Sequence, residues 1–69
     1  MDELTQVMSR HKAALTRAEN TGDPTRIIAA CDAAFADFEQ VGWPDCWSRW
    51  QRAKDDAMLI RARARTPQW

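Results

Sequence analysis

Two short breaks divide this 69-residue chain into three segments, and each segment carries a helix-like apolar repeat. The first break, residues 20–24, combines an asparagine or a glycine that ends a helix with an aspartate and a proline that begin one. The second break, residues 42–44, reads Gly-Trp-Pro, and its proline again marks a helix start. Short connections make consecutive helices antiparallel neighbours. We therefore predict an all-α fold, a compact three-helix bundle that runs up, down and up.

The three helices are expected over residues 2–20, 24–41 and 44 to 65 or 66. A single domain then covers residues 1–66, and residues 67–69 form a short C-terminal tail. At a rise of about 1.5 Å per residue, the third helix is the longest, so its C-terminal end should overhang the other two. Asp45 or Trp43 is expected to cap this helix, and both alternatives stay open.

Three of the four tryptophans fall within the segment GWPDCWSRW, residues 42–50. In a helix, spacings of four and three place Trp43, Trp47 and Trp50 on nearly one side. We expect Trp47 and Trp50 in the core, whereas Trp43 either closes the end of the bundle or stays exposed, and Trp69 either folds back or is loosely ordered. The predicted core is Leu4, Val7, Met8, Leu15, Ile28, Cys31, Phe35, Phe38, Trp47, Trp50, Ala53 and Ala57.

The formal net charge is zero, but the charges are unevenly distributed. Residues 1–45 carry four basic and eight acidic side chains, a net charge of −4, and residues 46–69 carry six basic and two acidic ones, a net charge of +4. A neutral molecule offers no overall electrostatic attraction to nucleic acid or to anionic membrane. The pattern indicates a bipolar molecule instead.

No group of residues has the spacing of a catalytic or metal site. His11, Cys31, Cys46 and Asp45 lack the close pairs, such as C-x-x-C, that zinc sites use. A lone histidine on an inner face is expected to bond a carboxylate or a carbonyl, and a proton-transfer role would require a second group that the sequence does not identify. We therefore predict no enzyme activity, no cofactor and no metal.

The compartment is predicted from the cysteines and from what the start of the chain lacks. Two cysteines in apolar stripes, without a signal-peptide pattern, indicate reduced thiols and a cytoplasmic location. No apolar run approaches the roughly 18 residues of a membrane-spanning helix.

The overhanging end of the third helix is the predicted functional surface, because no other part of the chain is expected to cover it. We expect a small non-enzymatic adaptor or modulator that binds another protein, or a second copy of itself as a homodimer, through this end. The predicted partner-binding residues are Trp43, Arg49, Arg52, Leu59, Ile60, Arg61, Arg63 and Arg65. The alternative is a nucleic-acid-binding protein that contacts phosphates through Arg49, Arg52, Lys54, Arg61, Arg63 and Arg65.

Overall fold

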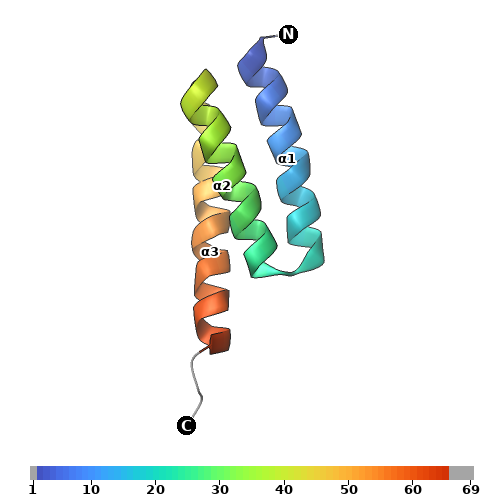
Figure 1. Ribbon diagram of the computed structural model, residues 1–69, viewed down its shortest axis with the longest axis vertical. Coiled ribbons are helices and arrows are strands. Elements are labelled where there is room, and N and C mark those ends of the chain that lie inside the picture. The colour runs from blue at the N-terminus through green and yellow to red at the C-terminus, as the bar shows by residue number, and fades with distance from the viewer. Residues whose placement is uncertain (1, 66–69) are drawn as a thin grey trace.

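The computed structural model describes residues 2–65, apart from the side chain of Arg65. It is an all-α three-helix bundle, and the up-down-up path of the chain can be followed in Figure 1. The helices and the 3₁₀ turn η1 that precedes the last of them are α1 (Glu3–Thr21), α2 (Pro24–Val41), η1 (Asp45–Trp47) and α3 (Ser48–Arg65). The predicted tail over residues 67–69, including Trp69, lies outside the described residues.

The ends of α1 and α2 are set by the residues that predicted them. The Asp2 carboxylate accepts a hydrogen bond of 2.7 Å from the backbone N–H of Thr5, so Asp2 caps α1 and the helix proper begins one residue later. Asp23 caps α2 in the same way and Pro24 occupies its first position. Gly22 ends α1 with a φ of 71°, a left-handed conformation that favours glycine.

The start of the third helix differs from the prediction. Pro44 does not begin a continuous α-helix, because Cys46 departs from helical geometry with φ −89° and ψ 15°. The Trp47 N–H donates to the Pro44 carbonyl at 3.1 Å and closes the 3₁₀ turn η1. Neither Trp43 nor Asp45 therefore caps α3, and the direction of the chain changes between η1 and the helix.

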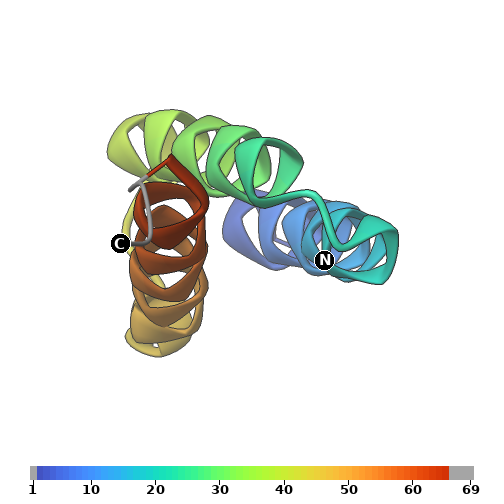
Figure 2. The ribbon, with the colours of Figure 1, turned by 90° about the horizontal axis from the view of Figure 1, so that it is seen from below.

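Helix α2 lies between the other two helices. Packing joins α1 to α2 and α2 to α3, and no comparable packing joins α1 to α3 within residues 2–65. Seen from below in Figure 2, α1 and α3 lie against different sides of α2. Figure 1 shows that α3 extends past the connection between α1 and α2, so the predicted overhang is present.

The core forms where the three apolar stripes meet. Trp50, Phe38, Leu15 and Cys31 are the largest fully buried side chains. Of the predicted core, Leu4, Met8, Phe35 and Ala53 are half-buried and pack against this cluster. The prediction is wrong for Trp47, which is 43% exposed, and the predicted core left out four buried residues: His11, Ala18, Ala34 and Pro44.

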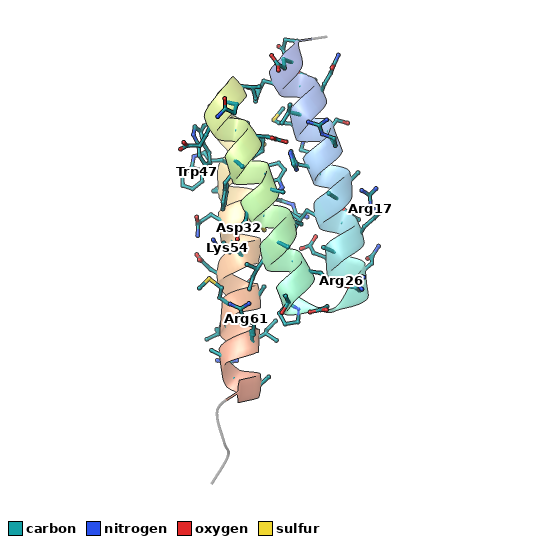
Figure 3. All side chains as sticks on the ribbon, viewed as in Figure 1. Arg17, Arg26, Asp32, Trp47, Lys54 and Arg61 are labelled. Carbon is teal, nitrogen blue, oxygen red and sulfur yellow. The ribbon has the colours of Figure 1, made fainter. Side chains whose placement is uncertain are left out.

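Trp47 is exposed because of its position in the fold. It lies in the 3₁₀ turn η1 before α3, so the α-helical spacing that predicted its burial beside Trp50 does not extend to it. Figure 3 places Trp47 on the side of α3 away from α1, where only α2 is available to cover it. Met58, another large side chain of α3, is similarly 45% exposed. A large side chain at the edge of a helix face is buried only where a second helix flanks that edge.

Candidate interaction surface

The C-terminal half of α3 exposes three consecutive large apolar side chains. Met58, Leu59 and Ile60 are 45%, 50% and 53% exposed. Successive residues of an α-helix point about 100° apart, so the three side chains surround the helix and do not form a single stripe. A protein partner covering them would have to contact more than one side of the helix. We call Met58, Leu59, Ile60, Arg61 and Arg63 the helix-end surface.

The arginines of this surface are free of ion pairs among the described residues. Arg61 follows Ala57 by one turn and is half-buried, whereas Arg63 is exposed. The side chain of Arg65 lies outside the described residues. A cation near the C-terminus of a helix is favoured by the helix dipole, and guanidinium groups without an acidic partner remain available for a carboxylate of another molecule.

The other predicted basic residues of α3 face different neighbours. Lys54 Nζ lies 2.6 Å from the Asp32 carboxylate on α2, a pair that Figure 3 labels, and it also lies over the ring of Phe35. Arg49 lies 3.0 Å from Glu19 on α1. The structure therefore does not gather the predicted basic residues on one face.

A polar hollow of about 270 Å³ separates α1 from the N-terminal half of α3. Its lining holds two basic side chains, Arg49 and Arg52, and two acidic ones, Glu19 and Asp56, and Arg49 pairs with Glu19. It is lined by Glu19, Cys46, Ser48, Arg49, Arg52, Ala53 and Asp56. Among the described residues, the Cys46 thiol contacts the Met8 sulfur, and neither this thiol nor the Ser48 hydroxyl forms a hydrogen bond with a basic side chain.

Trp43 and Trp47 line a second, almost entirely apolar hollow of about 260 Å³, which we call the tryptophan hollow. Their rings are 6.1 Å apart at 84°, and Trp43 is 46% exposed. The Trp43 ring also contacts Phe35 at 5.5 Å and Phe38 at 5.7 Å. Sequence reasoning included Trp43 among the binding residues but missed Trp47. The paired spacing of the two tryptophans around Pro44 is the signal that could have identified it.

The buried histidine has the structural role expected of a lone histidine. His11 Nε2 lies 2.6 Å from the Asp37 carboxylate, which accepts a hydrogen bond from that nitrogen. The imidazole ring packs edge-on against Phe38. Arg10 lies 3.5 Å from the same carboxylate. This hydrogen bond joins α1 to α2, and it gives the buried imidazole the polar partner that buried polar side chains normally have.

The cysteines are free thiols. Burial raises the pKa of the Cys31 thiol to about 11, and the neighbouring Asp32 carboxylate adds to this effect, so Cys31 stays protonated and unreactive near neutral pH. The Cys46 thiol lies 3.7 Å from the Met8 sulfur. Residues 2–65 bring together no group of three or more His, Cys, Asp or Glu side chains suited to a metal ion.

Comparison with known proteins finds no relative: no family model, no curated protein and no solved structure matches the chain. Within the described residues, no helix combines the length and the apolar character that crossing a membrane requires. The surfaces themselves are therefore the basis for any functional assignment.

Proposed function

We propose that this chain is a small non-enzymatic interaction module, an adaptor or modulator that binds protein through the helix-end surface. The observation that carries the proposal is the exposure of Met58, Leu59 and Ile60 in the C-terminal half of α3, whose end extends past the connection between α1 and α2 (Figure 1). Single exposed apolar residues are ordinary, but a run of three with arginines beside it has the composition of an interface centre.

The free energy available from covering exposed apolar surface supports a binding role for this end of α3. Covering apolar surface contributes roughly 25 cal/mol per Å² removed from water, and the fold leaves about half of this gain unused at Met58, Leu59 and Ile60, which are 45%, 50% and 53% exposed. The packing of α3 on α2 already contains Trp50 and Ala57, which are buried. The last turns of the helix are therefore not needed to complete the core, and a partner is the remaining source of burial.

The test compares protein capture by the wild type and by the double variant Ile60→Asp, Arg61→Glu, which we call the helix-end variant. Captured proteins should be lost with the variant, because it introduces charge into the apolar centre and reverses a guanidinium charge. The matched control is Ala13→Asp, Arg17→Glu, which makes the same two kinds of change at exposed positions of α1.

The control should capture the same proteins as the wild type. Capture of an identical set of proteins by all three forms would show that the helix-end surface is not the binding surface. Circular dichroism of each form establishes that the helices are intact.

Nucleic-acid binding is the alternative proposal, and the structure offers it less support because Arg49 and Lys54 already pair with acidic side chains. Phosphate contacts would give an affinity that falls steeply with salt, with a log–log slope of about 0.9 per contact on duplex DNA. The absence of a mobility shift at low salt would remove this alternative.

We also propose a cytoplasmic location. Its support is that Cys31 and Cys46 are both free thiols, which reducing compartments maintain.

A further inference from the structure

The tryptophan hollow is built on the packed core. The Trp43 ring rests on the side chains of Phe35 and Phe38, and Phe38 is fully buried. Pro44 is itself buried, and its carbonyl holds the Trp47 backbone through the 3₁₀ hydrogen bond. The two indoles meet edge to face with their ring centroids 6.1 Å apart, so the hollow lies beside the pair and not between the rings.

The size and lining of the hollow define what can fill it. At about 260 Å³ it lies below the roughly 300–1,000 Å³ of pockets that hold drug-sized molecules, so it suits one or two protein side chains. An apolar side chain would be buried against the exposed surfaces of the two indoles, and a cation over an indole face would gain a further attraction.

The charges beside the hollow that lack an ion pair are negative, whereas Lys54, which lies over the Phe35 ring, is paired with Asp32. Asp45 lies in the chain between the two tryptophans, and Glu39 follows Phe35 by one turn of α2. Both side chains are exposed, and neither forms an ion pair within the described part of the chain. The ligand that complements this region is therefore an apolar segment with flanking cations.

The helix-end surface has this chemistry. Leu59 and Ile60 supply exposed aliphatic side chains, and Arg61 and Arg63 supply guanidinium groups without ion pairs among the described residues. Arginine is also the side chain that most often stacks on tryptophan. The two surfaces thus match in both polarity and charge.

We propose that a second copy of this chain is the occupant, with the helix-end surface of one copy seated in the tryptophan hollow of the next. The proposal rests on the proposed function, because it names the partner of the same surface. It accounts for the bipolar charge distribution of the sequence, and one contact removes apolar surface from water on both sides, including one or two side chains of the helix-end surface. A symmetric pairing of two α3 ends would leave Trp43 and Trp47 in water.

The two surfaces lie on different parts of the molecule. Figure 3 shows Trp47 beside the upper part of α3 and Arg61 near its lower end. One copy can then bind two neighbours, one through each surface. A head-to-tail contact of this kind continues from copy to copy unless a ring closes, so the association is open-ended and depends on concentration.

Complementary variants test the proposal by sedimentation velocity. The hollow variant is Trp43→Ala, Trp47→Ala, and the helix-end variant defined above removes the other half of the contact. Wild type should form a concentration-dependent series of oligomers, whereas each variant alone should associate roughly 30-fold more weakly or worse, as expected for loss of interface anchors. An equimolar mixture should form a dimer that does not grow, because each variant retains one intact surface.

A second pair of variants leaves the aromatic packing untouched. Glu39→Lys, Asp45→Lys reverses the charge beside the hollow, and Arg61→Glu, Arg63→Glu reverses it on the helix end. Each alone should associate about tenfold or more weakly than wild type, and mixing the two should restore association because every contact is again between opposite charges. The Ala13→Asp, Arg17→Glu control should behave as wild type.

Two results would overturn the proposal. Wild type that stays monomeric at about 1 mM shows that the copies do not bind each other, and the proposed function then still stands if the helix-end variant loses captured proteins. A hollow variant that dimerises as strongly as wild type shows that the two α3 ends pair with each other.

Discussion

At the scale of single residues, two tryptophans three positions apart have opposite environments. Trp50 is fully buried, whereas Trp47 is 43% exposed. Burying the Trp50 indole costs free energy, because its Nε1–H group has no hydrogen-bond acceptor among the described residues. Burial of the large ring between α2 and α3 has to outweigh that loss. Trp50 therefore acts through its size and shape, and Trp47 is the indole that remains free to bind.

Cys31 gives the stability a dependence on pH. Burial holds its pKa near 11 in the folded chain, above the ordinary 9.0 of an exposed thiol. The stabilisation is fully present below pH 9.0 and is lost as the pH rises towards 11, because the unfolded thiol ionises first. We expect the free energy of unfolding, measured by urea titration, to fall across this window.

Cys31→Ala isolates the contribution of this thiol, because the variant keeps every other titratable group of the chain. The variant should be less stable at every pH because it leaves a small cavity, but its decline above pH 9.0 should be shallower than that of wild type. Parallel curves for the two proteins would contradict the assignment.

At the scale of the elements, α1 and α2 owe their boundaries to local chemistry. Asp23 accepts a hydrogen bond of 2.9 Å from the Thr25 backbone N–H, and it also lies 3.8 Å from the Arg26 guanidinium. The ion pair is exposed, and such pairs contribute little. The cap is therefore the interaction that matters at this helix start.

Replacing Asp23 should separate the two contributions. Asp23→Ala should cost about 1 kcal/mol of stability, the typical value of a lost N-cap, whereas Asp23→Asn should cost much less because its side-chain oxygen still caps the helix. Arg26→Ala removes only the ion pair and should be close to neutral. Thermal unfolding measures all three, and equal losses for Asp23→Asn and Asp23→Ala would assign the effect to charge.

The same distinction between local and non-local causes explains what the sequence could predict. The helix breaks, the bounds of α2 and most of the core depend on neighbouring residues, so patterns identified them. The exposure of Trp47 depends on the absence of a helix beside one edge of α3, and the 3₁₀ turn at Cys46 depends on how the chain leaves α2. Neither is encoded in the spacing of α3 itself. The tryptophan hollow was missed for that reason.

At the scale of the whole molecule, α2 is the element that holds the other two in place. Across the polar hollow, α1 and α3 are joined by the ion pair of Arg49 with Glu19, whereas each packs directly on α2. This arrangement leaves the two ends of the molecule different in charge and both partly apolar. It also means that the last turns of α3, which pass the end of the α1–α2 pair, are supported least.

Hydrogen exchange should reveal this gradient of support. In dilute protein, backbone amides of residues 58–65 should exchange much faster than those around Trp50, because local opening there exposes little buried surface. Helix ends fray in any case, so the last turn of α2 is the matched control: Phe38 is buried and Val41 half-buried there, and its amides should stay protected. Mass spectrometry of exchanged fragments makes the comparison. Equal exchange at both helix ends would show that the overhang of α3 confers no added mobility.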